Sequence, residues 1–296
     1  MSLARRRETT TISPDPRQVY PRFDIGTAKP SADDRRMVPY RGIDVDEPED
    51  RYSAAQWAEL AEAAIGEAFR LGRIPVIVGG TGFYIRALFQ PLFEEGELDP
   101  AARRRIQDSL KEASTDELRR WCAALDPARA RLGRAQLLRA IEVALLTGQR
   151  LSDLHRARPR SRHFRASYLL VDPGSVLATR IVSRAESMLD QGWTDEVRTL
   201  MRDVPENAPA WGATGYETVR RMVRGEIDRA AALERVVIDT RQYAKRQRTW
   251  FRHQLAMDRV VRVDTAAGGQ AERIVDDWMH ELEGGLRSSE RNEGRA

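Results

Sequence analysis

The stretch from Thr240 to Arg252 is the part of the chain whose residue types and spacing best suit the binding of anions. Its cations lie at i, i+4, i+7 and i+11, so a helix would place all four on one face: Arg241, Lys245, Arg248 and Arg252. The opposite stripe would dock on a core: Val237, Thr240, Ala244, Gln247 and Phe251. Because like charges at these spacings destabilise an isolated helix, the row predicts an anionic partner, for which phosphate is the first candidate. A solvated basic face is the alternative.

A glycine-rich turn, Gly79-Gly80-Thr81-Gly82, is the second candidate anion site. It follows a β-branched run at 74–78 and precedes a segment at 83–88 with helical character. In open parallel sheets, ligands bind at the carboxyl ends of strands, where backbone N–H groups at a helix start favour anions. Thr81 would add a hydroxyl donor to a phosphate oxygen. A simple tight turn is the alternative.

Asp15 is the candidate general base. It follows a short predicted strand at 9–13, which Pro14 and Pro16 end in a turn, and Arg17 and Gln18 come directly after it. An ionised carboxylate beside hydrogen-bonding side chains can accept a proton from a bound substrate at neutral pH. The commoner role of such an aspartate is to cap a turn.

Several other kinds of chemistry are excluded. Residues 24–30 look like a phosphate loop, but Lys29 is preceded by Ala and followed by Pro, so the pattern G-x-x-x-x-G-K-[ST] is not met. There is no G-x-S-x-G, and the four histidines lack metal-ligand spacing: His155, His163, His253 and His280. Cys122 is the single cysteine, so an internal disulfide is impossible, and we interpret it as a small buried apolar residue.

Bulk composition permits nucleic acid as a partner without requiring it. The 296 residues carry a formal charge of +4, with 49 basic residues interleaved with 45 acidic ones. No run of 18 apolar residues occurs, and the first residues lack the apolar segment of a signal peptide. We therefore expect a soluble, cytoplasmic, monomeric protein with no membrane partner.

The candidate site residues must be positioned by strands that alternate with helices. A charge-rich helical stretch interrupts this alternation. Predicted strands lie at 74–78 and 167–171, and a predicted helix at 54–71 is ended by Gly72. Further helices are predicted at 100–112, 115–124, 134–147, 175–191, 194–202, 213–224 and 229–256. The pattern indicates an α/β fold with a parallel sheet. Its parts are core segments at 1–98 and 166–283, a helical insertion at 99–165 and a disordered tail at 284–296.

Six segments, in order along the chain, resemble the tRNA dimethylallyltransferase family. They are DPRQVYPRFDIGTAKP at 15–30, YSAAQW at 52–57, IPVIVGGTGFYIRAL at 74–88, RAIEVALLTGQ at 139–149, TGYE at 214–217 and TRQYAKRQRTWFR at 240–252. The resemblance implies a P-loop-kinase-like parallel sheet core with an all-helical insertion that grips the anticodon stem-loop. It also implies transfer of a dimethylallyl group from dimethylallyl diphosphate to the exocyclic amine of the tRNA adenosine just 3′ of the anticodon, with Mg²⁺ as cofactor.

The same resemblance implies roles for individual residues. It makes Asp15 the base that takes the proton from the amine, and it matches Gly80, Thr81 and Arg241 to positions that contact the diphosphate. It places the following residues in tRNA-contacting motifs: Asp15, Arg17, Gln18, Gln136, Arg139, Lys245 and Arg248. The target base must be flipped out of the anticodon loop to reach such a site. The basic loop at 155–165 would contact the RNA backbone.

The chain also departs from the family pattern. Family members carry a P-loop before the segment of Asp15, and the 296 residues contain none. In addition, Pro16 stands where the family usually has Ser, and residues 133–137 differ from its usual Pro-Asn-Asp-x-Gln-Arg stretch. We therefore expect a core without its first strand and P-loop, and weak or no activity, either because the start lies too far downstream or because catalysis has been lost. A catalytically silent tRNA-binding protein and an adenine-nucleotide prenyltransferase remain as alternative functions.

Overall fold

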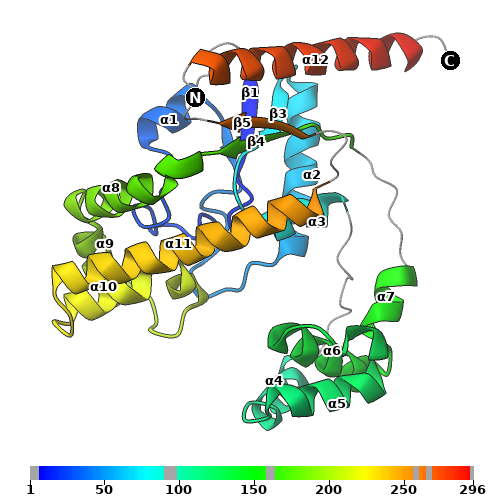
Figure 1. The fold of residues 1–296 in the computed structure, drawn as a ribbon, viewed down its shortest axis with the longest axis vertical. Helices are drawn as coiled ribbons and strands as arrows, with labels where there is room; N and C mark the ends of the chain where they lie inside the picture. The colour runs from blue at the N-terminus through cyan, green and yellow to red at the C-terminus, as the bar shows by residue number, and fades with distance from the viewer. Residues whose placement is uncertain (1–6, 90–98, 158–163, 256–259, 265–268, 294–296) are drawn as a thin grey trace. The chain divides into compact units, whose positions relative to one another are not determined.

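The computed structural model describes residues 7–89, 99–157, 164–255, 260–264 and 269–293 (Figure 1). The chain divides into two compact units, one formed by Met1–Ile85 with Phe164–Ala296 and the other by Arg86–His163. The larger unit combines parallel strands with helices and the smaller one is helical, which gives the mixed α/β fold expected from the sequence. The smaller unit begins earlier than the predicted insertion at 99–165, whose start was placed at a change in composition.

The larger unit contains a three-stranded parallel sheet. β1 (Thr9–Ile12) lies between β2 (Tyr40–Arg41) and β3 (Ile74–Ile77). The register pairs Thr9 with Ile74 and Ile12 with Ile77. The predictions of strands at 9–13 and 74–78 are confirmed, whereas β2 was missed because two residues are too short to show a period. Since β1 and β3 are parallel neighbours, the residues that follow them meet at one edge of the sheet.

A second parallel sheet pairs β4 (Tyr168–Asp172) with β5 (Val260–Asp264). Tyr168 lies opposite Val260, and the two strands end together at Asp172 and Asp264. The strand predicted at 167–171 is confirmed, and β5 was not predicted.

β3 is half-buried, although its apolar sequence predicted a fully buried strand. Ile74 to Ile77 all keep partial exposure, and Val78 is 58% exposed. The reason is its place in the sheet, because β3 pairs with β1 alone among the described strands and so leaves one edge unpaired. Val171 in β4 is likewise 53% exposed.

Helix α2 (Ala54–Arg70) packs on the three-stranded sheet through an alanine-rich face that includes Trp57 and Ile65. Ser53 caps its first turn, where the Gln56 amide donates to the Ser53 hydroxyl and the Gln56 side chain accepts from the Ser53 amide. Gly72 ends the helix at φ +67°, a backbone conformation that favours glycine, as predicted. The indole of Trp57 donates to the carbonyl of Ser13 at 2.6 Å, which fixes the chain just beyond β1.

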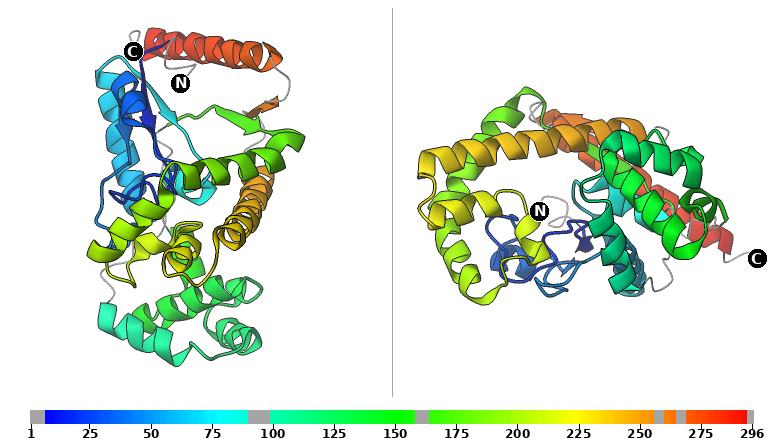
Figure 2. Two further views of the ribbon diagram at one scale, coloured as in Figure 1. Left: turned by 90° about the vertical axis from the view of Figure 1, so that its left-hand side faces the viewer. Right: turned by 90° about the horizontal axis from the view of Figure 1, so that it is seen from below.

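The main hydrophobic core of the larger unit lies between helices in the second half of the chain and residues 19–23. The remaining elements of this unit are α1 (Ala32–Met37), α3 (Gly82–Phe89, which begins here), η2 (Gly174–Val176), α8 (Leu177–Asp190), α9 (Trp193–Asp203), η3 (Pro209–Gly212), α10 (Tyr216–Val223), α11 (Arg229–Gln254) and α12 (Gly269–Glu293). α11 packs along α8 and α10 (Figure 2). Among the described residues, none of the helices has the length and hydropathy needed to cross a bilayer.

α12 corrects one prediction. Its backbone is helical to Glu293, whereas a disordered tail was expected at 284–296, of which residues 294–296 lie outside the described part. The helix is anchored in its first half, where Trp278 and Met279 are buried and the Trp278 indole donates to the Ser167 hydroxyl at 2.7 Å. The prediction of disorder rested on the polar composition of the second half alone and did not include the buried Trp278 and Met279.

The smaller unit is a group of short helices. They are α4 (Pro100–Ser109), α5 (Thr115–Leu125), η1 (Pro127–Arg129), α6 (Arg134–Thr147) and α7 (Leu151–Ala157). The three helices predicted here are confirmed, and Cys122 is buried in their core beside Leu118 and Leu137, as expected. α7 takes up the start of the basic loop predicted at 155–165, and residues 158–163 of that loop lie outside the described residues.

Candidate active site

Asp15 lies at the carboxyl end of β1, in a turn that holds its carboxylate in place. Its Oδ1 accepts from the amide of Arg17 at 2.8 Å, and its own amide donates to the hydroxyl of Ser13 at 3.3 Å. Burial raises the pKa of Asp15 above its ordinary value of 3.8, against the opposing effect of the Arg17 and Gln18 amides and of the Arg17 and Arg184 charges. A carboxylate with a raised pKa binds a proton more tightly than an exposed one. This combination suits a general base.

This raised pKa predicts the pH dependence of the transfer reaction that the resemblance implies. A base must be ionised to act, so kcat/KM falls as the pH drops through its pKa in the free protein. We expect the acidic limb of the kcat/KM profile to bend above pH 3.8, and to disappear when Asp15 is replaced. A rate profile between pH 4 and pH 8 measures it. A limb that stays unchanged in an Asp15 variant with residual activity would assign it to another group.

The two residues after Asp15 are held by protein partners. The Arg17 guanidinium donates to the carbonyl of Pro209 at 2.7 Å and lies against Gly212, where an added Cβ would come within 2.9 Å of its Nη2. The Gln18 side chain accepts from the Ser13 hydroxyl at 2.8 Å and donates to the carbonyls of Thr27 and Ala28. Gln18 therefore serves to shape its own loop, and its contact with tRNA stays a prediction.

The Gly79–Gly82 turn lies beside the Asp15 segment. An added Cβ on Gly79 would lie 2.6 Å from Cδ of Pro14, so the chain beyond β3 runs against the chain beyond β1. The carbonyl of Thr81 starts α3 by accepting from the amides of Tyr84 and Ile85. The structure thus brings together two of the three features singled out in the sequence, Asp15 and the glycine-rich turn.

α11 covers this turn with a row of side chains at i, i+4 and i+7. The ring of Trp250 occupies the space beside Gly82 and leaves no room for a Cβ there. The side chain of Gln247 occupies the space beside Gly80 and would have to move to admit one. The hydroxyl groups of Tyr243 and Thr81 lie 3.5 Å apart. The need for small residues in the turn therefore has a packing cause, which the sequence did not reveal.

The four cations of α11 line one groove, as their spacing predicted. The groove has a volume of about 450 Å³ and lies between α11 and the start of α8, lined by Arg241, Lys245, Arg248 and Arg252 with Gly174, Ser175 and Leu177. Among the residues that the structure describes, only Arg248 of the four has an ion pair, with Asp172 at 3.3 Å. Three uncompensated cations beside the amino end of a helix favour an anionic ligand.

Thr81 and Arg241 lie on different sides of α11. Thr81 meets α11 at Tyr243, whereas Arg241 lies about 200° further round the helix and lines the groove with α8. Both can contact one diphosphate only if the ligand extends round the helix or a side chain moves. The diphosphate-binding roles of Gly80, Thr81 and Arg241 therefore stay predictions.

The two candidates in the smaller unit have structural partners of their own. Gln136 caps α6 by accepting from the amide of Gly133 at 3.2 Å. Arg139 pairs at 2.9 Å with Glu142, a buried carboxylate that also pairs with Arg103 on α4. These contacts tie the helices of the unit together and leave tRNA contact by Gln136 and Arg139 as a prediction.

The residues that hold the loop at 24–26 in place were not predicted from the sequence. Glu196 accepts from the amides of Asp24 and Ile25 at 3.0 and 2.7 Å and from the hydroxyl of Tyr216 at 2.7 Å. Burial raises the pKa of Glu196, despite these donors. The ring of Trp193 fills the space beside Gly26. Tyr216 had been noted in the segment at 214–217, but no spacing connects Glu196 with a loop some 170 residues earlier.

The described residues contain no group of three or more carboxylate, histidine or cysteine side chains that could hold a metal ion. Mg²⁺ usually binds one or two carboxylates together with the phosphates of a ligand, so it stays a prediction for this site. Asp15, at the end of the neighbouring strand, accepts from the amide of Arg17 in its own turn. We therefore assign no step to Mg²⁺ and retain it only as a component of the assays below.

A family model described as IPP transferase matches residues 18–254 of the chain. Among curated proteins, the chain is 40% identical over 282 residues to a tRNA dimethylallyltransferase of Alkalilimnicola ehrlichii, a match that covers 93% of this chain and 89% of the relative. The residues matched by the family model include the glycine-rich turn and α11, and begin three residues after Asp15.

Solved structures share the fold. The full-length tRNA isopentenylpyrophosphate transferase of Bacillus halodurans is similar with a TM-score of 0.67 and 28% identity, covering 99% of this chain and 93% of that one. A eukaryotic dimethylallyltransferase acting on tRNA is similar with a TM-score of 0.76 over 94% of this chain and 75% of that one, and at 24% identity this likeness concerns the fold alone.

Proposed function

The chain belongs to the IPP transferase family, and we propose that it transfers a dimethylallyl group from dimethylallyl diphosphate to N6 of the adenosine 3′-adjacent to the anticodon in tRNA. One observation carries the proposal. Asp15 and the Gly79–Gly82 turn follow the neighbouring strands β1 and β3 and meet through Pro14 and Gly79, so a base and a candidate diphosphate site lie side by side.

In the proposed reaction the amine nitrogen of adenosine attacks the allylic carbon bonded to the diphosphate oxygen. The new C–N bond forms as the C–O bond breaks, and the bonding electrons leave with the diphosphate. The nitrogen must also lose a proton, and Asp15 accepts it at a carboxylate oxygen. Burial of Asp15 strengthens this base, because it raises the pKa of the carboxyl above its ordinary value.

Negative charge grows on the leaving diphosphate, so cations and donors held in place stabilise the transition state more than the ground state. The Thr81 hydroxyl and the Arg241 guanidinium are the proposed donors. Thr81 is fixed at the start of α3, while Arg241 extends from a helix packed on α8 and α10. Because the two groups lie on different sides of α11, the diphosphate must extend round the helix or a side chain must move before both can contact it.

Lys245 and Arg248 are proposed to bind the anticodon stem-loop through its phosphates, together with the other cations of the groove. Each phosphate contact releases a counterion, so binding should weaken with salt by a slope of about 0.7 per contact on single-stranded RNA. Arg17, Gln18, Gln136 and Arg139 stay secondary candidates, since each of these side chains already has protein partners.

We further propose that the two sheets accept one more parallel strand. β3 leaves one edge unpaired, its apolar residues are half-exposed, and Val78 and Val171 are more than half exposed. A strand that pairs with β3 on one side and β4 on the other would cover these residues and join the two sheets. A strand of the P-loop type would also bring backbone donors for the diphosphate to the carboxyl ends of β1 and β3.

Transfer of labelled dimethylallyl to an anticodon stem-loop, with Mg²⁺ present, tests the function and the added strand together. The 296-residue chain is compared with one carrying an added N-terminal strand, P-loop and helix. We expect the longer chain to turn over faster by about 10²-fold or more, because diphosphate donors act mainly in the transition state. Equal rates would contradict the added strand. Salt-dependent stem-loop binding without turnover by either chain would instead support a silent tRNA-binding protein.

A further inference from the structure

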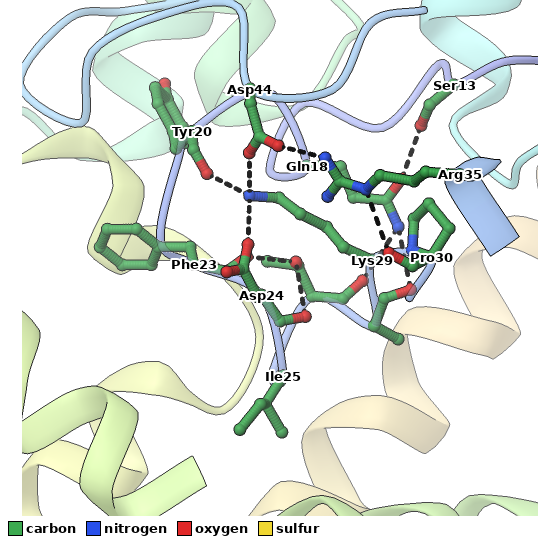
Figure 3. Close-up of polar contacts among 12 residues, drawn as sticks. Ser13, Gln18, Tyr20, Phe23, Asp24, Ile25, Lys29, Pro30, Arg35 and Asp44 are labelled. Carbon is green, nitrogen blue, oxygen red and sulfur yellow. Dashed lines mark hydrogen bonds and ion pairs between the residues drawn. The ribbon is translucent and has the colours of Figure 1, made fainter. Parts of the chain in front are cut away.

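Lys29 lies in the 24–30 segment, to which the proposed reaction assigns no role. Its side chain is 1% exposed, and its ammonium donates to the carbonyl of Tyr20 at 2.5 Å and to the carboxylates of Asp24 and Asp44 at 2.8 and 2.5 Å (Figure 3). The second oxygen of Asp44 accepts from Arg35 at 2.6 Å. All three N–H groups of the ammonium thus have an acceptor, which a buried cation requires.

This ammonium ties the loop after Asp15 to itself and to a second stretch of chain. The loop contributes the Tyr20 carbonyl and the Asp24 carboxylate, and the second stretch contributes Asp44. The second stretch also bonds the loop directly, since the amide of Asp44 donates to the carbonyl of Gln18 at 3.0 Å. The side-chain amide of Gln18 reaches back to the carbonyls of Thr27 and Ala28, the two residues before Lys29 (Figure 3).

Two residues of this network have unusual backbone conformations. Ala28, directly before Lys29, has φ +51°, and Asp44 has φ +55°. Neither is glycine, so each conformation has an energetic cost and persists only where the surrounding contacts hold it. The contacts that hold these two are the hydrogen bonds of Lys29, Gln18 and Asp44 described above.

We propose that Lys29 is a positioning residue, whose ammonium fixes residues 15–20 and thereby holds Asp15 and Arg17 in their working geometry. The path is short. Lys29 fixes the carbonyl of Tyr20 and the loop that receives the Gln18 amide, and Gln18 accepts from the Ser13 hydroxyl, which in turn accepts from the amide of Asp15. A displacement of about 1 Å at a reacting group can cost about 10²-fold in rate, so a loose segment would slow the reaction with the fold intact.

Lys29→Met in the full chain tests this, with Arg22→Met as the matched control. Arg22 also lies within residues 15–30, and its replacement by Met also removes one positive charge. Its ion pair with Asp203, however, is on the surface. We expect amide hydrogen exchange of peptides within residues 15–30 to become about 10-fold or more faster in Lys29→Met, with α8 to α11 unchanged. Arg22→Met should match the parent chain in both regions.

The kinetic part of the test rests on the proposed function. We expect kcat to fall by about 10- to 100-fold in Lys29→Met, while KM for the stem-loop and for dimethylallyl diphosphate stays within about twofold. A residue that only stabilised the fold would change the active fraction and the exchange of the whole unit instead. Exchange measurements need no turnover, so they decide the positioning role even if no transfer is found.

Asp44→Asn provides a second variant should Lys29→Met fail to fold. It removes one charge and keeps an oxygen acceptor for the ammonium, so we expect a smaller but similarly local increase in exchange at residues 15–30. Unchanged exchange at residues 15–20 in either folded variant, or an equal effect in Arg22→Met, would overturn the proposal.

Discussion

Asp15→Asn is expected to lower kcat for dimethylallyl transfer by about 10²–10⁴-fold, the usual contribution of a positioned general base. Asparagine keeps an oxygen that can accept from the amide of Arg17, so the turn beyond β1 should survive. It cannot take the proton from the adenosine amine. Because the loss falls on the chemical step, KM for the stem-loop should change little.

Single-turnover transfer with saturating donor measures this loss, using the more active of the two chains compared above. Asp203→Asn is the control, since it removes the same charge from a carboxylate on the surface whose ion pair joins α9 to Arg22. Stem-loop binding by Asp15→Asn is measured in parallel. A drop of less than about tenfold in kcat, with binding intact, would mean that another group or water accepts the proton.

Local pattern was enough to predict the parts of the site that follow strands. β1 and β3 were recognised from short runs rich in β-branched residues and ended by Pro or Gly, and in a parallel sheet the residues beyond such strands meet at one edge. The cations of α11 could be assigned to one face because their spacing follows the helical period and few carboxylates interrupt it. These predictions depend on neighbours in sequence, and the structure confirms them.

The contacts between distant segments could not be predicted in this way. The sequence shows the glycines at 79–82 but not that Gln247 and Trp250 need their space. It shows Lys29 as one of three lysines but not that Asp44 and the Tyr20 carbonyl surround it. Each of these contacts joins stretches with no shared period, so a pattern within one stretch carries no information about the other.

The half-buried state of β3 has a related cause. An apolar run predicts burial when the strand is covered and paired on both sides, and the sequence alone does not say which strand lies at an edge. β3 pairs with β1 alone among the described strands, and its exposed Val78 follows from that place. An added strand beside β3 should therefore lower the hydrogen exchange of residues 74–78 as well as raise the rate.

Arg241→Gln is expected to lower kcat by about 10²–10³-fold if its guanidinium stabilises the leaving diphosphate, which is the usual cost of losing one such donor. The prediction is informative because Arg241 lies in the α8–α11 groove and not beside Thr81. Should Arg241 instead bind only RNA phosphate, kcat at saturating stem-loop would be unchanged, and the salt slope of binding would fall by about 0.7.

Arg252→Gln separates these two roles, because Arg252 lines the same groove and carries the same charge but is three helical turns further along α11. We expect it to reduce the salt slope of stem-loop binding by about 0.7 and to leave kcat unchanged. A loss of kcat confined to Arg241→Gln would show that one end of the groove serves the diphosphate and the remainder serves RNA. Equal effects of both variants on binding, with kcat intact, would instead assign the whole row of cations to the nucleic acid and leave Thr81 as the one proposed diphosphate donor among the side chains considered.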